Sequence, residues 1–170
     1  MFVRKNVSLL QIFVQINVVI SYKLVQKNVD MKRNVLSKLI DWKNKKNRKP
    51  LILNGARQVG KTYILREFGS QCYEKMAYVN CDKNKMLEKI FSQDYNISRI
   101  LLSLSAILHV NIEPGNTLVI FDEIQESPTV LNSLKYFCED APQYHVAVAG
   151  SLLGISLHNN TSFPVGKVDM

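Results

Sequence analysis

The sequence predicts an α/β fold in which helices cover both faces of a parallel sheet, and two observations carry this prediction. Short segments that are apolar throughout recur from Pro50 onward, as expected for strands that are buried on both faces. Segments with helical spacing of apolar residues separate them, which is the order of elements in a three-layer α/β protein. A chain of 170 residues is long enough for one such domain.

Four strands and four helices are expected to alternate along this part of the chain. The strands are Leu51–Asn54, Ala77–Asn80, Thr117–Phe121 and Tyr144–Ala149. Helices are expected over Gly60–Phe68, Lys85–Phe91 and Ile97–Leu108, and a fourth with Ser127 as its N-cap and Pro128 at its first position. The first of these helices is expected to pack through Tyr63, Ile64, Leu65 and Phe68, and the fourth through Val130, Leu131, Leu134 and Phe137.

An amphipathic helix is predicted before the core, in residues 31–49, where it leads into the basic connector KNKKNRK. Its apolar residues at helical spacing are Val35, Leu36, Leu39 and Ile40. Residues 1–30 are expected to be an extension outside the fold, and residues 50–170 are expected to form the α/β core.

Positive charge is concentrated in the first third of the chain. Residues 1–50 hold 12 Lys and Arg against 2 Asp and Glu, whereas residues 51–170 hold 10 against 12. The connector is interpreted either as a solvated helix end or as a surface that contacts nucleic acid. The sequence has no base-reading motif and no interleaved aromatic residues to support the second interpretation.

A membrane anchor is not expected. The apolar segment Val7–Ile20 is shorter than the roughly 20 residues of a membrane span, and Gln11, Gln15 and Asn17 interrupt it. No small-residue cleavage site follows it, so a signal peptide is not predicted either. The 3 cysteines are scattered and lack CxxC spacing, which favours reduced thiols in a cytoplasmic protein.

A phosphate-binding loop is predicted at GARQVGKT, which has the Walker A pattern G-x-x-x-x-G-K-[ST] between a strand and a helix. The glycines let backbone N–H groups turn toward phosphate oxygens, and the next helix presents its positive end to them. Lys61 is expected to contact the β- and γ-phosphates, and the Thr62 hydroxyl to bind Mg²⁺. The expected nucleotide-binding residues are Gly55, Ala56, Arg57, Gln58, Val59, Gly60, Lys61, Thr62 and Tyr63.

Two carboxylates follow the apolar strand LVIF, at Asp122 and Glu123, as in a Walker B motif. Ligands bind at the carboxyl ends of parallel strands, so these carboxylates are expected beside the phosphate loop. Asp122 is then a ligand for Mg²⁺, directly or through water, and Glu123 is the residue that polarises the attacking water. The alternative is a strand that runs into an acidic solvent loop.

Two other strand ends carry polar candidates. Ser151 follows the strand that is expected between the loop strand and the Asp-Glu strand, where a small polar side chain reports on hydrolysis. Asn80 has a weaker claim to the same kind of role. For both residues the alternative interpretation is a turn.

Five stretches together resemble the prokaryotic AAA-type P-loop ATPases, namely RKPLILNGARQVGKTYILREFG, AYVNCDKN, TLVIFDEIQESP, LKYFCEDAPQYHVAVAGSLLG and SFPVGKVDM. The resemblance covers residues 31–170. It implies a three-layer P-loop NTPase core that binds ATP with Mg²⁺ and hydrolyses it. It also implies a catalytic site of Lys61, Glu123 and the sensor residue Ser151, with Thr62 and Asp122 at the metal.

Members of this family continue past the last of these stretches into a further core strand, a helical lid and a C-terminal domain of unknown function. The present sequence stops at Met170, so the last core strand and the lid are expected to be missing, and Lys167 is a candidate for a positive charge near the site. Two alternatives to hydrolysis stay open: a nucleotide-binding module with little turnover, and a DNA-associated protein. A second copy of the chain or another protein is considered as a partner.

Overall fold

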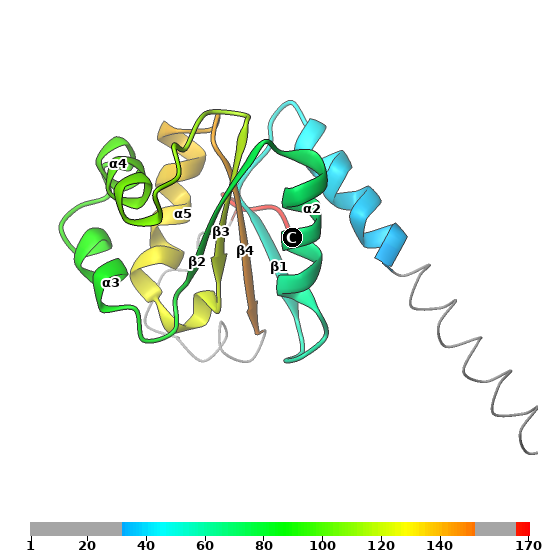
Figure 1. Cartoon of the computed structure of the whole chain (residues 1–170), viewed down its shortest axis with the longest axis horizontal. Coiled ribbons are helices and arrows are strands. Elements are labelled where there is room, and N and C mark those ends of the chain that lie inside the picture. The colour runs from blue at the N-terminus through cyan, green and yellow to red at the C-terminus, as the bar shows by residue number, and fades with distance from the viewer. Residues whose placement is uncertain (1–31, 152–165) are drawn as a thin grey trace, which may run out of the picture. The chain divides into compact units, whose positions relative to one another are not determined.

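Four parallel strands form the single sheet of the computed structural model, which describes residues 32–151 and 166–170. The order of the strands in the sheet is β1-β4-β3-β2. In chain order the elements are β1 Leu51–Gly55, α2 Lys61–Cys72, β2 Lys75–Asn80, α3 Lys85–Phe91, α4 Ile97–Leu108, β3 Thr117–Asp122, the 3-10 turn η1 Ile124–Glu126, α5 Pro128–Asp140 and β4 His145–Ser151. Helices α3, α4 and α5 cover one face and α2 the other, so the predicted three-layer α/β fold is confirmed (Figure 1).

A further helix, residues 32–44, precedes the sheet. The chain divides into two units within this helix, between Lys38 and Leu39, and the packing described below is that of residues 39–170. The predicted extension of residues 1–30 lies outside the described residues. Among the residues that the structure describes, no helix combines the length and the apolar character needed to cross a membrane.

The predicted elements differ from the observed ones mainly at their ends. Helices α3 and α4 have the predicted bounds, whereas α2 continues beyond Phe68 to Cys72. The prediction that Tyr63 packs into the core is wrong, because its side chain is 63% exposed. The buried face of α2 consists of Ile64, Leu65, Phe68 and Gly69.

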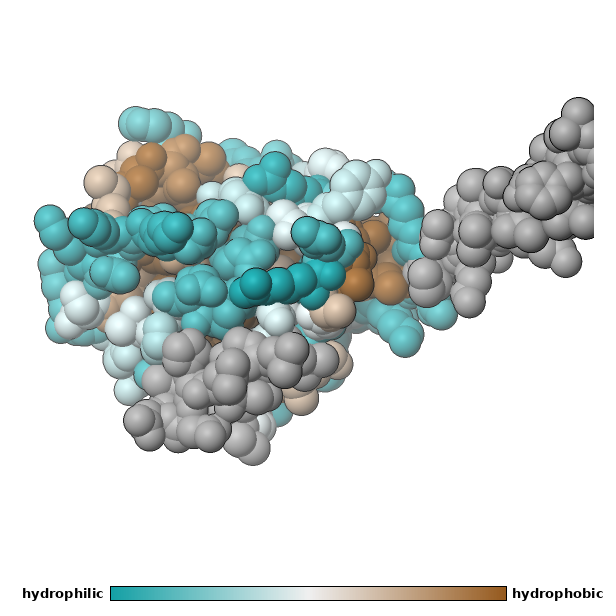
Figure 2. All heavy atoms as spheres, turned by 90° about the horizontal axis from the view of Figure 1, so that it is seen from below, coloured by the Kyte–Doolittle hydropathy of each residue, from teal (hydrophilic) through white to brown (hydrophobic). Residues whose placement is uncertain are grey.

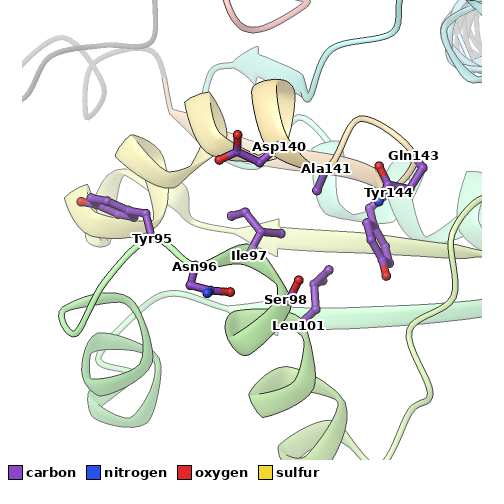
Figure 3. A pocket seen from close by; sticks show the side chains of 9 residues that line it. All are labelled: Tyr95, Asn96, Ile97, Ser98, Leu101, Asp140, Ala141, Gln143 and Tyr144. Atoms are coloured by element: carbon purple, nitrogen blue, oxygen red, sulfur yellow. The ribbon is translucent and has the colours of Figure 1, made fainter.

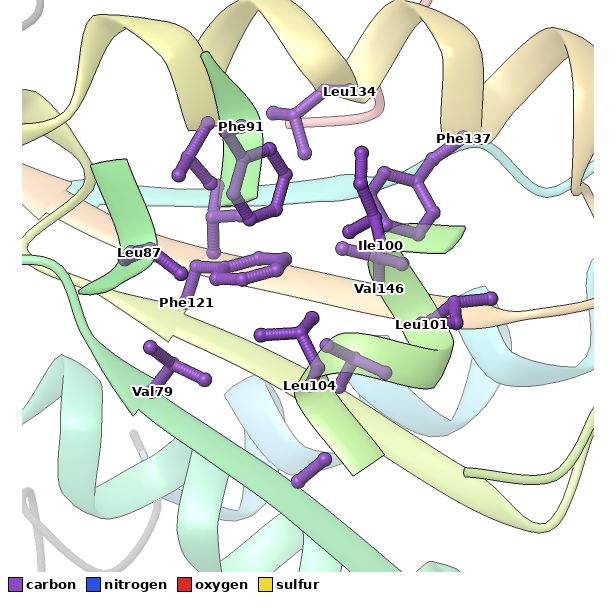
Figure 4. Packing of buried hydrophobic residues seen from close by; sticks show 14 of the residues in the cluster. Val79, Leu87, Phe91, Ile100, Leu101, Leu104, Phe121, Leu134, Phe137 and Val146 are labelled. Atoms are coloured by element: carbon purple, nitrogen blue, oxygen red, sulfur yellow. The ribbon is translucent and has the colours of Figure 1, made fainter. Parts of the chain in front are cut away.

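The larger part of the core lies between the sheet and helices α3, α4 and α5 (Figure 4). The Phe121 ring of β3 meets Phe91 of α3 edge-on, with centroids 5.8 Å apart, and lies 6.4 Å from Phe137 of α5. The strand residues on this face include Val79, Val119, Val146 and Val148. Continuous apolar strands with aromatic and branched residues on this face anchor all three helices.

On the opposite face, α2 approaches the sheet closely at Gly69. A Cβ atom at this position would lie 2.8 Å from the sulfur of Met76 and 3.4 Å from a methyl group of Leu118. The strand residues on this side include the small Ala147 and Ala149 of β4, which are fully buried. Small side chains on both partners therefore let α2 lie close to the sheet.

The basic connector is used within the molecule. Arg48 donates to the carbonyl oxygens of Lys43 (3.0 Å) and Pro142 (3.1 Å), and Lys49 Nζ donates to that of Gly166 (2.6 Å). Lys45 pairs with Asp169 at 2.7 Å, and the backbone of Asp169 forms a parallel bridge with Leu51. Many of the basic side chains that suggested contact with nucleic acid thus bond to other segments of the chain. Contact with nucleic acid stays a prediction.

Candidate active site

The phosphate-binding loop connects β1 to α2 at the carboxyl end of the sheet, which Figure 2 shows from below with a largely hydrophilic surface. Gln58 and Gly60 have positive φ angles of 62° and 88°. At Gly60 an added Cβ would meet no atom within 4 Å, so the backbone conformation, and not lack of space, requires glycine there. Such alternation of left-handed residues turns backbone N–H groups toward one side of a loop.

Helix α2 begins directly after Gly60, and its positive end faces the loop. Gly60 has no side chain that could cap the first N–H groups, and the first turn contains no acidic residue. Those N–H groups have no partner within the helix, and the helix dipole adds partial positive charge at the same place. A phosphate group fits this combination of loop and helix end.

Lys61 lies across the loop. Its ammonium group donates to the carbonyl oxygens of Gly55 at 3.0 Å and Ala56 at 2.7 Å. Arg57 is exposed, and Val59 is 62% exposed. The lysine charge is thus held against the backbone of the loop by two neutral carbonyl groups.

Asp122 at the end of β3 is 6% exposed and accepts hydrogen bonds from three donors. Thr62 Oγ1 of α2 and the Tyr78 hydroxyl of β2 each donate to its Oδ2 atom at 2.8 Å. The backbone N–H of Glu123 donates to its Oδ1 atom at 3.0 Å. The structure therefore brings the two predicted metal ligands, Thr62 and Asp122, into direct contact.

Tyr78 is a member of this site that the sequence did not single out. The Arg66 guanidinium lies 3.9 Å from the centre of its ring. Burial, and then the hydrogen bond to Asp122, raises the pKa of the Tyr78 hydroxyl, which keeps it a proton donor to that carboxylate. The available signal was a hydroxyl-bearing side chain in the strand next to the Asp-Glu strand.

Glu123 has the left-handed backbone conformation, with φ 51° and ψ 45°, which is unusual for a residue with a side chain. Its carboxylate accepts a hydrogen bond from the Gln125 amide at 2.5 Å. The other end of that amide accepts a hydrogen bond from the backbone N–H of Ser151 at 3.1 Å. Ser151 lies at the end of β4, in register with Gly55 at the start of the loop.

Two other sequence candidates are used elsewhere. The Asn80 side chain accepts a hydrogen bond from the Asp82 N–H at 2.8 Å, so it forms the turn after β2. The suggestion that Lys167 supplies charge near the site is wrong, because it pairs with Glu139 at 2.8 Å, in the last turn of α5 and at the other end of the sheet.

The cysteines and the possible metal ligands set limits on the chemistry of the site. All three cysteines are free, and burial followed by the charges of Asp122 and Glu123 raises the pKa of the Cys81 thiol to about 12. That thiol therefore stays protonated and takes no part in acid–base chemistry.

Within residues 32–151 and 166–170, no group of three His, Cys, Asp or Glu side chains forms a metal cluster. Mg²⁺ bound through one or two protein oxygens and substrate phosphates needs no such cluster.

A separate pocket of about 280 Å³ lies at the opposite end of the sheet (Figure 3). The start of α4, the last turn of α5 and the segment before β4 line it. Asp140 is the one charged residue among the described residues that line this pocket. It shares no residue with the phosphate loop.

The strand order, the loop between β1 and α2 and the carboxylates at the end of β3 define a P-loop NTPase-like fold. The family model described as "AAA domain" matches residues 47–170, and the chain belongs to this family. Membership of this family supports ATPase-like nucleotide binding.

A Walker-type ATPase of Pyrococcus abyssi is among the solved structures similar to this chain, with a TM-score of 0.51 and 17% sequence identity. The match covers 79% of this chain and 50% of the other, so the chain spans half the length of that protein. At this identity the likeness concerns the fold. A comparison with curated proteins gives no match.

Proposed function

We propose that this AAA domain binds ATP together with Mg²⁺ and hydrolyses it to ADP and phosphate. The contact of 2.8 Å between Thr62 and Asp122 carries the proposal, because it joins the phosphate loop to the Asp-Glu pair. Separately, each motif has a structural alternative. Their meeting at one end of the sheet supports a common site with an anion cradle, an oxygen pair for a metal ion and a second carboxylate.

Binding of the phosphates is assigned to the loop from Gly55 to Thr62. Backbone N–H groups of Ala56, Arg57, Gln58, Val59 and Gly60 and the start of α2 are the donors for the phosphate oxygens. Lys61 exchanges its carbonyl partners for the β- and γ-phosphates. Tyr63, exposed in the first turn of α2, is the candidate for contact with the nucleotide beyond its phosphates.

Thr62 and Asp122 are the residues that fit Mg²⁺. A hydroxyl oxygen and a carboxylate oxygen are the hard ligands that this ion prefers, and the two lie 2.8 Å apart. When bound, Mg²⁺ neutralises the negative charge on the phosphate oxygens. The three hydrogen bonds to Asp122 fix the direction of its carboxylate beforehand.

Glu123 is assigned as the residue that activates the attacking water. Its carboxylate orients the water and accepts its proton as the bond from the water oxygen to the γ-phosphorus forms and the bond to the ADP oxygen breaks. Ser151, at the end of the strand between β1 and β3, is proposed as the sensor residue.

Steady-state phosphate release by the full chain tests this function. Glu123→Gln should lower kcat by about 100-fold or more while ATP affinity stays within about threefold, because the amide cannot accept the proton. Glu74→Gln is the matched control, since Glu74 is exposed on the segment between α2 and β2, and it should leave kcat unchanged. If wild type shows no turnover above that of Glu123→Gln although both bind ATP, hydrolysis by this chain is contradicted and only nucleotide binding remains.

A further inference from the structure

Gln125 connects two of the proposed functional residues through one buried side chain. The residue is 3% exposed and lies in the 3-10 turn after β3. Its Nε2 atom donates to Glu123 Oε2 at 2.5 Å, and its Oε1 atom accepts from the backbone N–H of Ser151 at 3.1 Å. These are the only two hydrogen bonds of the Gln125 side chain among the described residues.

The local backbone explains why the Gln125 side chain reaches the Glu123 carboxylate. The left-handed conformation of Glu123 reverses the chain directly after β3. The Glu126 N–H then donates to the Glu123 carbonyl at 2.9 Å, and Ile124, which lies between Glu123 and Gln125, is fully buried. A residue with a side chain is strained in the left-handed conformation, so surrounding contacts must maintain this turn.

The chemistry of an amide fits these two partners in one orientation. The NH₂ group faces a carboxylate, which accepts hydrogen bonds, and the carbonyl oxygen faces a backbone donor. A flipped amide would place its oxygen against the carboxylate and its NH₂ group against the N–H of Ser151. The orientation of the Gln125 amide, and with it the direction of the Glu123 carboxylate, is therefore defined by the end of β4.

We propose that Gln125 is a positioning residue that fixes the Glu123 carboxylate against the end of β4. In the pairing of β1 with β4, Ser151 is in register with Gly55, where the phosphate loop begins. Backbone pairing and the Gln125 amide thus connect the loop to the carboxylate in three steps, from Gly55 through Ser151 and Gln125 to Glu123. The catalytic consequence of this connection rests on the proposed ATP hydrolysis, whereas the connection itself does not.

Two variants of the full chain separate the two hydrogen bonds. Gln125→Leu removes both of them, and Gln125→Glu keeps an oxygen that accepts from Ser151 but loses the donor to Glu123. Backbone amide hydrogen exchange at Ser151, measured by NMR, reports the bond from Ser151 to Gln125. The kcat for ATP reports the bond from Gln125 to Glu123. Gln71→Leu is the matched control, because Gln71 also donates to a glutamate, Glu67, at 3.1 Å but on the exposed side of α2.

We expect kcat to fall by about 10- to 100-fold in both Gln125 variants, with the Kd for ATP within about threefold of wild type. Exchange at Ser151 should rise by about tenfold or more in Gln125→Leu and stay near the wild-type rate in Gln125→Glu. Gln71→Leu should change none of these quantities.

Unchanged kcat in both variants would overturn the positioning role. Unchanged Ser151 exchange in Gln125→Leu would overturn the connection to β4. A fall in kcat accompanied by an equal loss of ATP affinity would assign Gln125 to the folding of the turn and contradict the proposal. If wild type itself releases no phosphate, ATP hydrolysis is contradicted together with the catalytic role, while the exchange comparison still decides the connection.

Discussion

Asp122 and Glu123 are adjacent in the sequence but are held in different ways. Asp122 continues the strand and accepts donors from α2, β2 and its own neighbour, whereas Glu123 leaves the strand in a left-handed conformation. The sequence predicted both carboxylates, because two charges after four buried apolar residues need a partner. It did not predict Gln125, because the role of that side chain depends on the backbone reversal at Glu123. It did not predict Tyr78 either, because its contact with Asp122 depends on the pairing of β2 with β3.

His145 is the first residue of β4, at the end of the sheet away from the phosphate loop. Its environment predicts a pH dependence of stability. Its ring is 7% exposed, contacts the Tyr73 hydroxyl at 2.7 Å and packs edge-on against Trp42. Burial, and then the positive charges of Arg48 and Lys43, lowers the pKa of His145 to about 4. The folded protein therefore holds this histidine neutral where the unfolded chain begins to protonate it, at about pH 6.5.

The stability that His145 contributes should be complete above about pH 6.5 and should decline as the pH falls toward 4, because only the unfolded state takes up the proton in that window. We expect the free energy of unfolding, measured with urea, to fall by about 2 kcal/mol between pH 7 and pH 4.5. His145→Asn should remove most of this slope. His109→Asn should retain it, since His109 is exposed and its left-handed backbone tolerates asparagine. An unchanged slope in His145→Asn would contradict the assignment.

At the scale of elements, α2 decides where the phosphate loop lies. The helix packs against all four strands through one face, and its N-terminus begins at Gly60 in the loop. Its close approach at Gly69 depends on the absence of a side chain there. The sequence predicted the helix and its loop correctly but not its full length or the exposure of Tyr63. Apolar spacing does not distinguish an exposed aromatic residue in the first turn from a buried one.

Gly69→Val should therefore destabilise the fold by moving α2 away from the sheet. The added side chain would overlap Met76 and press on Leu118, which lie 2.8 Å and 3.4 Å from the Cβ position. We expect the free energy of unfolding to fall by about 1–3 kcal/mol relative to Ser70→Val, a matched change at the exposed neighbouring position. Urea unfolding of both variants measures this difference. Equal stability of the two variants would mean that α2 does not depend on close packing at Gly69.

At the scale of the whole molecule, the fold class, the strand order around the site and the convergence of the two motifs follow from simple rules. Parallel strands end at the same edge of a sheet, and consecutive apolar segments with intervening helices give such strands. The role of the basic connector could not be predicted in this way. Its partners include Gly166 and Asp169, which are more than 110 positions further along the chain. Its charge pattern alone is equally compatible with a solvated helix end.

Equilibrium binding of ATP in the presence of Mg²⁺ tests the central claim most directly, that this edge of the sheet is a nucleotide site. In isothermal titration calorimetry with the full chain, wild type and Lys46→Ala should bind ATP with the same Kd. Lys46 is an exposed lysine of the connector and serves as the charge-matched control. Lys61→Ala should bind at least about 30-fold more weakly, because the ammonium charge next to the loop backbone is lost. ATP affinity that is equal in wild type and Lys61→Ala, or absent from both, would contradict the assignment of this site.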